Sequence, residues 1–487
     1  MESIENTFSG VIDFGRRIQL DVQRNGDLVH QMTWEVTLPE LGQDQSQDPL
    51  PAAPGGVCWA PNIGHTLIRN VEVIIGGTEI DKHYGIWFDV YDELTLPEEK
   101  RRGYNRMIGQ QNPDKQTGGQ GITTYNAGGV GGVSMHNGEA LVSEVVNGLQ
   151  TPRNGPVPQV LPVPQPTGPG TPGYSHPQTT LQVPLRFWFN KNAGLALPLI
   201  ALQFHQVRMQ FELRPRNECV ALVPDPTISD LTMACPRVDG NPQLLGACLW
   251  VVYVFLDNDA RQHYAQNPHE YLIKQLQFTG CEGIPGNCPR FRLNFNHPTT
   301  ELVWFTQEDD CVFQCATNPN LWHVAPNDTN PALPSNPFIY QRRLGGNAWN
   351  CYEVADPAGP IQNVYAQPGG LAGGLHINPM IDAKLQMNGQ DRFATRIGEY
   401  FNETQPYYHH TRVPESKGVF MYSFALDPEE HQPQGTANFS RLDTVTLQMR
   451  LRNINGTQGN PGKIYVFAVN YNFFRVAGGM GGLAFAA

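Results

Sequence analysis

Four cysteines gather in one stretch of the sequence, and their thiols are the first candidates for a metal site. They are Cys281, Cys288, Cys311 and Cys315. A structural zinc site usually begins with a tighter pair of cysteines, and the gap between Cys288 and Cys311 is untypical of one. The spacing therefore favours buried free thiols, with a metal site as the alternative. The chain has nine cysteines, and this odd number favours reduced thiols over a disulfide framework.

Two further polar clusters could hold an ion. His409 and His410 are adjacent, and neighbouring residues of a strand point to opposite faces, so the pair makes a poor chelate. The acidic run of residues 308–310 follows an expected strand. A calcium role is conceivable there, but a solvated edge is the commoner role of such a run.

The sequence also lacks the spacings of several enzyme motifs. Residues 456–463 contain glycine and lysine but miss the phosphate-loop pattern. The GGMGG stretch of residues 478–482 opens no expected helix, so it is not a dinucleotide-binding loop. The sequence contains no Gly-x-Ser-x-Gly elbow. We therefore predict no catalytic residue, no cofactor and no bound metal.

The elements that would position any site are mainly strands. Two stretches far apart in the chain, VRMQFEL and VTLQMRL, alternate apolar and polar residues in nearly the same way, which is typical of strands with one buried face. The apolar members, which we expect to line two cores, are Val207, Met209, Phe211, Leu213, Val445, Leu447, Met449 and Leu451. Ser440, Arg441 and Asp443 precede the second stretch. We expect them to fix the start of that strand, with Arg441 and Asp443 pairing locally or across an interface.

Other segments show where the strands begin and end. Asn25 and Gly26 separate two alternating runs and can adopt the positive φ angles of a tight hairpin turn. Residues from Gly85 onward carry apolar side chains every four positions, which predicts a helix. Residues 109–180 and 316–378 are rich in glycine and proline, and we interpret them as long surface loops.

Together these patterns predict an all-β protein. Its length of 487 residues suits two domains, and its 49 glycines and 41 prolines favour short strands joined by loops. The two halves repeat a similar series of strands, which predicts two tandem eight-stranded antiparallel jelly-roll sandwiches with a few short helices in loops. An immunoglobulin-like tandem is the alternative, but the Cys…Trp…Cys framework is missing.

The expected boundaries follow from the same patterns. We expect an N-terminal arm over residues 1–13 and a first sandwich over 14–258. A helical linker over 259–271 leads to a second sandwich over 272–476, and a glycine-rich tail follows over 477–487.

Composition excludes several kinds of partner. The formal net charge is −12, and no basic run is longer than residues 100–102, so direct binding of nucleic acid is not expected. The start of the sequence, MESIENTFSG, does not read as a secretory signal. The longest apolar runs fall short of a membrane span, so we expect any relation to a membrane to be indirect.

Several longer strings resemble one known family. They include QRNGDL (23–28), NIGHTLIRNVEVIIGGTEIDKHYGIWFDVYDELT (62–95), VPLRFWFNKNAGLALPLIALQFHQVRMQFELR (183–214), VYVFLDNDARQHYAQNPHEYLIKQLQ (252–277), NFNHPTTELVW (294–304) and IYVFAVNYNFFRVAGGMGGLAF (464–485). A long block over residues 388–447 belongs with them. With these strings the chain resembles the major capsid proteins of the nucleocytoplasmic large DNA viruses, such as iridoviruses and phycodnaviruses.

The resemblance implies a structural role without catalysis. It implies two jelly rolls in tandem and a homotrimer of six rolls that forms a pseudo-hexagonal capsomer of an icosahedral shell. The implied partners are other copies of the chain, neighbouring capsomers, penton and minor capsid proteins, and an internal viral membrane only indirectly. The implied location is the virion capsid, assembled in the host cytoplasm. The resemblance also places residues 109–180 on the outer surface and makes residues 1–13 an inner arm.

Two alternatives stay open at this point. One is a scaffolding relative of the same fold that is shed on maturation. The other is a carbohydrate-binding or carbohydrate-cleaving jelly-roll protein, whose aromatic platform could use Trp188, Trp250 or Trp304. We interpret these three side chains as core aromatics because they lie in apolar strands.

Overall fold

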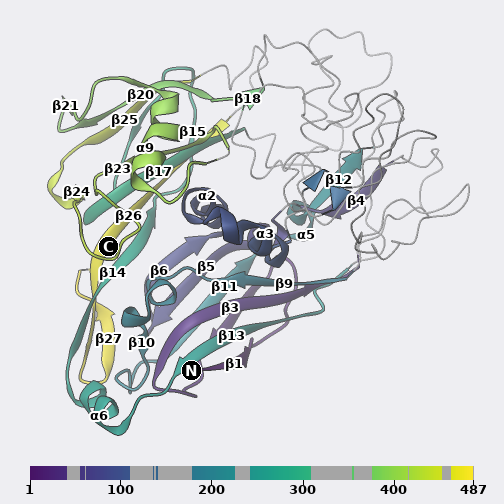
Figure 1. The fold of residues 1–487 in the computed structure, drawn as a ribbon, viewed down its shortest axis with the longest axis vertical. Coiled ribbons are helices and arrows are strands. Elements are labelled where there is room, and N and C mark those ends of the chain that lie inside the picture. The colour runs from purple at the N-terminus through teal and green to yellow at the C-terminus, as the bar shows by residue number, and fades with distance from the viewer. Residues whose placement is uncertain are drawn as a thin grey trace, which may run out of the picture.

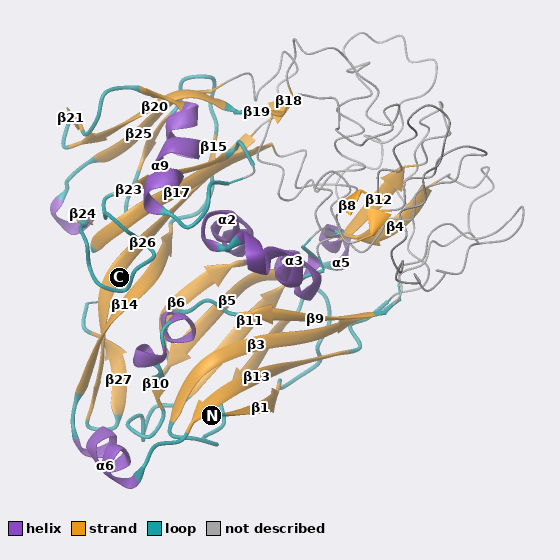
Figure 2. Cartoon of the chain, viewed as in Figure 1, coloured by secondary structure: helices purple, strands orange, loops and turns teal. Residues whose placement is uncertain are grey.

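A computed structural model describes the chain over residues 1–40, 55–60, 62–109, 135–136, 139–140, 178–224, 242–308, 354–355, 376–414, 416–451 and 462–485. Within these residues the strands form two sandwiches, one from each half of the chain, and we call each of them a roll (Figure 1). The strands dominate both rolls, and the helices are short and lie in the connections between strands (Figure 2).

The first roll consists of two antiparallel sheets. One contains, in order, β1 (Glu2–Thr7), β13 (Gly246–Val254), β3 (Leu28–Leu38) and β9 (Thr179–Pro184), with β10 (Leu197–Pro198) beside the start of β3. The other contains β2 (Arg17–Asp21), β11 (Val207–Leu213), β5 (Ile68–Ile75) and β6 (Thr78–Tyr84). Two small ribbons accompany them: β4 (Gly55–Trp59) with β12 (Val220–Pro224), and β7 (Met135–His136) with β8 (Glu139–Ala140).

The second roll is built in the same way. One sheet contains β14 (His269–Phe278), β26 (Gly462–Ala477), β17 (Pro298–Glu308) and β23 (Val419–Ser423), joined by β15 (Glu282–Gly283), β24 (Ala437–Asn438) and β27 (Met480–Leu483). The other contains β16 (Arg290–Arg292), β25 (Val445–Leu451), β20 (Met380–Met387) and β21 (Gln390–Asp391), with β22 (Arg396–Ile397). A short ribbon pairs β18 (Val354–Ala355) with β19 (His376–Ile377).

The two rolls share one strand order. If the principal described strands of each roll are numbered along the chain, one sheet reads first, eighth, third and sixth, and the other reads second, seventh, fourth and fifth. This is the jelly-roll arrangement, so the predicted fold class is confirmed. Strands β11 and β25 are both seventh strands, each lying between the second and fourth strands of its roll. The repeated sequence pattern therefore marks equivalent positions in the two rolls.

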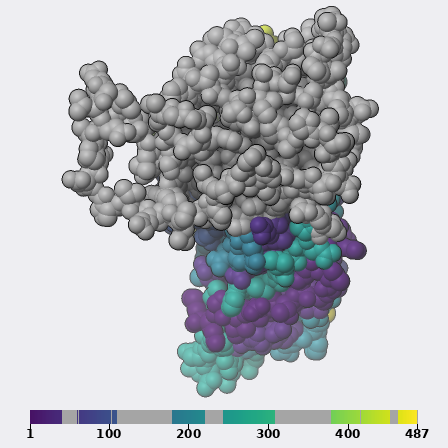
Figure 3. Space-filling view, turned by 90° about the vertical axis from the view of Figure 1, so that its right-hand side faces the viewer, coloured from purple at the N-terminus to yellow at the C-terminus, as the bar shows by residue number. Residues whose placement is uncertain are grey.

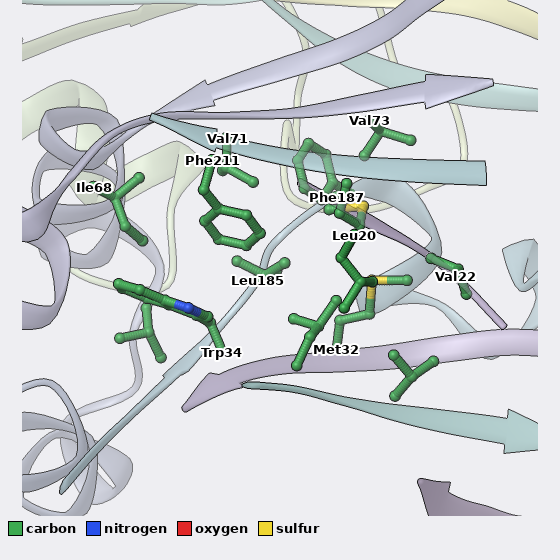
Figure 4. Close-up of a cluster of buried hydrophobic side chains, with 14 of the residues drawn as sticks. Leu20, Val22, Met32, Trp34, Ile68, Val71, Val73, Leu185, Phe187 and Phe211 are labelled. Atoms are coloured by element: carbon green, nitrogen blue, oxygen red, sulfur yellow. The ribbon is translucent and has the colours of Figure 1, made fainter. Parts of the chain in front are cut away.

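Each roll is held together by apolar side chains between its sheets. In the first roll Trp34 of one sheet and Phe211 of the other lie with ring centroids 5.5 Å apart, and both are buried (Figure 4). Leu185 and Phe187 add to the same cluster from the segment after β9. The face of this roll shown in Figure 3 places early strands, in purple, beside much later ones, in teal, as expected when β13 lies between β1 and β3.

The helices of the described residues are short. They are α1 (Ile63–Leu67), α2 (Gly85–Thr95), α3 (Glu98–Met107), α4 (Trp188–Lys191), α5 (Arg216–Cys219), α6 (Asn258–Gln266) and α9 (Gln405–His409), with a π-helical turn at Tyr400–Thr404 and 3₁₀ turns at Ala193–Leu195 and Phe439–Arg441. Helix α2 begins at Gly85, as predicted from the four-residue spacing. Among the described residues, no helix has the length and apolar character needed to cross a membrane.

The predicted hairpin at Asn25 and Gly26 is wrong. Strands β2 and β3 on either side of it belong to different sheets, so the connection crosses from one layer of the roll to the other. Neither residue has a positive φ angle. Gly26 is required for another reason, since a Cβ there would lie only 2.7 Å from the Cβ of Tyr253 on β13. The dipeptide marks a close approach of backbone to a core tyrosine.

The boundaries at the two chain ends also need correction. Residues 2–7 are a full strand of the first roll, paired along their length with β13, whereas we predicted an arm. The predicted tail folds back as β27 against the end of β26, through a turn at Gly478 and Gly479, both with positive φ angles. Both segments are short, and they are polar or glycine-rich, so they lack the alternation of apolar and polar residues that predicts a strand. Their partner strands are also distant in the sequence. The linker is helical, but β14 already begins at His269.

Candidate functional site: the junction between the rolls

The candidate site is the junction where helix α2, from the first roll, packs on a sheet of the second roll (Figure 1). The helix contributes an apolar face, and the sheet contributes outward side chains of three neighbouring strands. The buried members are Ile86, Trp87, Val90, Tyr91 and Leu94 from α2, Val303 and Phe305 from β17, Val419 and Met421 from β23, and Phe467 and Val469 from β26. The rings of Trp87 and Phe467 lie 5.1 Å apart.

The start of helix α2 depends on a glycine. A Cβ on Gly85 would lie 2.1 Å from the carbonyl oxygen of Ile68 and 2.2 Å from that of His65. Any side chain would therefore push the helix away from β5 and α1. The glycine lets α2 follow β6 directly and lie between the two rolls.

Packing against α2 buries both faces of the second roll's sheet. On β17, Leu302 and Trp304 point into the roll's own core, whereas Val303 and Phe305 contact the cluster around α2. Residues 299–307 are all buried as a result. A strand covered on both faces carries a continuous apolar run and loses the alternation of a half-exposed strand. The LVWF run in β17 is the sequence signal of this junction.

The opposite face of α2 is polar and equally buried. Asp89 accepts a hydrogen bond from Nδ1 of His65 (2.7 Å), and Nε2 of His65 lies 2.9 Å from the Tyr104 hydroxyl. Asp92 forms an ion pair with Arg186. Burial raises the pKa of Asp89, although the bonded His65 opposes this shift. These contacts fix α2 to the first roll, so that the helix behaves as part of that roll when it meets the second.

A buried ionic cluster of the second roll lies at the border of the junction. The side chain of His410 is completely buried between Glu301 (2.8 Å from Nε2) and Glu429 (2.9 Å from Nδ1). Burial alone would lower the pKa of His410, but the charges and hydrogen bonds of the two carboxylates outweigh it and raise the pKa to about 9. Burial likewise would raise the pKa of Glu429, but hydrogen bonds from His410 and Thr411 lower it. The imidazolium is thus held as a cation at neutral pH, with its edge against the Tyr91 ring of α2.

Hydrogen bonds also cross the junction. The backbone N–H of Arg412 donates to the carbonyl of Leu94 at the end of α2 (3.0 Å), and its guanidinium lies 3.4 Å from the Glu98 carboxylate. The N–H of Leu276 on β14 donates to the Asp81 carboxylate on β6 (3.1 Å). Apolar packing, a buried ion cluster and backbone hydrogen bonds therefore fix the angle between the rolls together.

The predicted core residues all lie in the two roll cores. Val207, Met209, Phe211 and Leu213 are buried in the first, and Val445, Leu447, Met449 and Leu451 are buried in the second. The polar residues between them are half-buried or exposed. The two rows lie in separate rolls and do not contact one another.

The three residues ahead of β25 have different roles from one another. The hydroxyl of Ser440 accepts a hydrogen bond from the backbone N–H of His297 (2.8 Å), a residue with a positive φ angle of 65°. The N–H of Asp443 donates to the side chain of Asn388. Within the described residues, no ion pair joins Arg441 and Asp443, and Arg441 is exposed. The local pairing that we predicted for these two is therefore absent from the chain as described.

The remaining candidate residues differ in exposure, and some of them lie outside the described residues. Cys281 and Cys288 are exposed free thiols, so the prediction that they are buried is wrong, because the loop around β15 lies at a sheet edge. Cys311 and Cys315 lie outside the described residues, as do Asp309, Asp310 and most of the two long loops. His409 is half-buried at the end of α9, whereas the side chain of His410 is completely buried. Sequence reasoning missed the role of His410 because both of its carboxylate partners are distant in the chain.

The aromatic residues of the carbohydrate alternative do not form an exposed platform. Trp304 in β17 and Trp188 are buried as predicted, although Trp188 lies in helix α4 and not in a strand. Trp250 is half-buried on the outer face of β13, so the prediction that it is a core residue is wrong. Asn402 begins the triplet Asn-Glu-Thr, which has the acceptor pattern for N-glycosylation, but its side-chain amide is buried and donates to the carbonyls of Ser416 and Val419, so it is not accessible to a glycan.

Comparison with protein families matches nearly the whole chain. Residues 1–257 match the family described as the major capsid protein N-terminus. Residues 260–482 match the family described as the large eukaryotic DNA virus major capsid protein. The change from one family to the other falls at helix α6, between the two rolls.

Individual relatives match this chain along nearly their full length. The major capsid protein of Phaeocystis pouchetii virus is 40% identical, with the alignment covering 100% of this chain and 92% of the relative. The major capsid protein of Paramecium bursaria Chlorella virus 1 is 31% identical, covering 100% of this chain and 91% of the relative. A solved structure of the PBCV-1 virus capsid matches with a TM-score of 0.65 and 29% identity, covering 100% of this chain and 96% of that one. The Faustovirus major capsid protein matches at the same TM-score with 14% identity, covering 98% of this chain and 90% of that one, and supports the fold alone.

Proposed function

The chain belongs to the family of large eukaryotic DNA virus major capsid proteins, and on this premise we propose that it forms homotrimeric, pseudo-hexagonal capsomers of an icosahedral shell. Three chains with two rolls each present six similar blocks around one threefold axis. Such a unit has a nearly six-sided outline although its true symmetry is threefold.

One observation carries this proposal: the two rolls have the same strand order and are fixed to one another by a buried junction. A six-sided block needs its rolls at a constant angle within every chain. An apolar contact reinforced by a buried ion cluster keeps two domains from moving as independent bodies, whereas small polar contacts between domains permit such motion.

The proposal includes partners and location. The partners are further copies in the trimer, neighbouring capsomers, penton and minor capsid proteins, and the internal membrane only indirectly. The protein acts in the virion capsid after assembly in the host cytoplasm, with no catalytic activity and no direct contact with nucleic acid. The net charge of −12 supports this last point because the phosphate backbone would repel an acidic surface.

Sedimentation velocity of the full chain tests the trimer. The chain has a mass of 54.2 kDa, and we expect one dominant species at three times that mass under mild conditions. A chain that stays monomeric at high concentration would contradict the proposal. The scaffolding alternative is tested separately by counting copies in mature particles, because a scaffold is lost on maturation whereas a shell subunit stays at high copy number.

A further inference from the structure

The helical segment after the fifth strand begins in the same way in both rolls. In the first roll a Cβ on Gly85 would lie 2.1 Å from the carbonyl oxygen of Ile68, the first residue of the fourth strand. In the second roll a Cβ on Gly398 would lie 2.2 Å from that of Met380, which also begins the fourth strand. The side chain three positions after each glycine is a phenylalanine buried in the core of its own roll. Residues 398–409, which we call the second-roll helix, therefore occupy the place that α2 has in the first roll.

The two equivalent helices differ in what covers their outer faces. The side chains of α2 that pack on the second roll lie one, two, five, six and nine positions after Gly85. The side chains at the same distances from Gly398 are half-buried or exposed; they are Glu399, Tyr400, Glu403, Thr404 and Tyr407. Tyr407 and its neighbour Tyr408 are 71% and 70% exposed. In the described part of the single chain, the outer face of the second-roll helix therefore stays open.

The sheet that α2 covers also has an equivalent in the first roll. Trp34 and Trp304 occupy matching core positions in the third strands β3 and β17. The residue before each tryptophan pairs with Trp250 of β13 in the first roll and with Phe467 of β26 in the second. Phe467 is fully buried against Trp87 of α2, whereas Trp250 is half-buried. The outer face of the sheet containing β1, β13, β3 and β9, which we call the first-roll face, thus keeps an aromatic side chain at the position where α2 packs in the second roll.

The two open surfaces match the two sides of the junction within one chain. Figure 1 shows α9 and the strands β1, β13 and β3 on opposite sides of helix α2, so each surface can face a different neighbour. On the basis of the proposed trimer, we propose that the second-roll helix of one chain docks on the first-roll face of the next chain, as α2 docks on the second roll within a chain. Three such head-to-tail contacts close a ring in which contacts within and between chains alternate.

The contact between chains is more polar than the junction. Trp250 and Tyr407 supply aromatic rings, which are enriched in protein interfaces. Glu5, directly opposite Trp250, and Glu35 lie on the first-roll face, and Glu403 lies on the second-roll helix. The strands of the first-roll face contain no lysine or arginine. The contact therefore depends on burial of the aromatic rings, and repulsion between carboxylates makes it weaker than the apolar junction.

Sedimentation velocity of the full chain tests this contact at about 0.1 M salt, where charges still act over about 10 Å. Tyr407→Asp and Trp250→Asp each add a carboxylate to the contact. Each should raise the concentration at which half of the chains are trimeric by at least about tenfold. Phe485→Asp removes an exposed ring beside Phe473, beyond the part of β26 that pairs with β17, and as the matched control should associate as the parent does. Thermal unfolding of each variant checks folding.

Glu403→Lys should have the opposite effect, which misfolding cannot imitate. It places an ammonium group opposite Glu5 and Glu35 and should lower the same concentration by at least about threefold. Glu282→Lys, at an exposed position of β15, makes the same change in net charge and should stay within about twofold of the parent.

The outcomes separate this contact from the trimer itself. A parent chain that is monomeric would contradict the proposed trimer and the contact with it. A trimeric parent whose Tyr407→Asp and Trp250→Asp variants associate equally well would overturn the docking proposal alone. The same holds if Glu403→Lys associates no more tightly than Glu282→Lys.

Discussion

The eighth strands of the two rolls, β13 and β26, occupy the same place in the same fold and yet differ in burial. Strand β13 alternates, with Leu249, Val251 and Tyr253 in the core and the residues between them half-buried. Strand β26 is buried on both faces through its middle, because α2 covers its outer side. The third strands β3 and β17 differ in the same way. The two rolls therefore use the same strand arrangement differently. In the second roll the outer face of this sheet is buried in the junction, whereas the outer face of the corresponding sheet in the first roll stays partly exposed.

The largest effect should come from a charge placed in the repeated core. Leu447→Asp puts a carboxylate among apolar side chains of the second roll, and we expect a loss of roughly 4 kcal/mol or more in the free energy of unfolding, or failure to fold. Phe211→Asp on the equivalent strand of the first roll should behave alike. Thr446→Asp, one position away on the outer side, should fold with nearly parental stability. Denaturant unfolding measures all three, and a tolerated Leu447→Asp would contradict the assignment of β25.

The second largest effect on stability should come from the ionic cluster at the junction. His410→Gln removes the buried cation between two carboxylates, and we expect a loss of about 3 kcal/mol at pH 6 in the free energy of unfolding. The neighbouring histidine provides the control. Half-buried His409 lies outside the ion cluster and its ring hydrogen-bonds to the Leu426 carbonyl, so His409→Gln should cost no more than about 1 kcal/mol. Equal losses for the two variants would show that the buried cluster contributes nothing specific.

The same cluster predicts that the free energy of unfolding depends on pH. The folded-state pKa of His410, about 9, lies above the ordinary value of 6.5, so the stabilisation is complete below pH 6.5 and is lost as the pH rises through 9. The lowered pKa of Glu429 has the opposite sign, and its contribution is lost in acid, below the ordinary value of 4.5. Unfolding free energies at pH 6, 8 and 10 should therefore converge for the parent and His410→Gln. If the difference in unfolding free energy between the parent and His410→Gln stays constant up to pH 10, the protonated imidazole of His410 is not the source of the stabilisation.

A matched pair of valines tests the asymmetry of the two sheets. Val303→Ala removes methyl groups buried against α2, and we expect a loss of about 2 kcal/mol in the free energy of unfolding. Val252→Ala makes the same change on the outer face of β13, where the side chain is half-buried, and should cost less than about 1 kcal/mol. Similar costs at the two positions would mean that the outer faces are equally covered.

The smallest effect concerns the start of β25. Ser440→Ala removes the acceptor of the His297 backbone N–H, and we expect a loss of about 1 kcal/mol in the free energy of unfolding. Arg441→Ala is the control, because that exposed side chain should contribute little to stability. If Arg441→Ala proves the more damaging of the two, the start of the strand is held by a contact other than the one from Ser440.

The strands with one buried face could be predicted from the sequence, because alternation is a local signal. Strands β11 and β25, helix α2 and the helical link at α6 all follow from spacing within a dozen residues. The junction could not be predicted in this way, since α2 meets β26 across most of the chain and His410 meets Glu301 across more than a hundred positions. The same limit explains why β1 and β27 were missed: their partners are remote, and their own residues carry no apolar row.

The central claim is that two rolls fixed on one chain make a six-sided unit from three copies. Electron microscopy of the isolated full-length protein tests it most directly, through class averages viewed along the symmetry axis. We expect a threefold-symmetric particle with six lobes, two from each chain, joined in alternating intra-chain and inter-chain contacts. A single pair of lobes, or a ring whose lobe number is not six, would contradict the account.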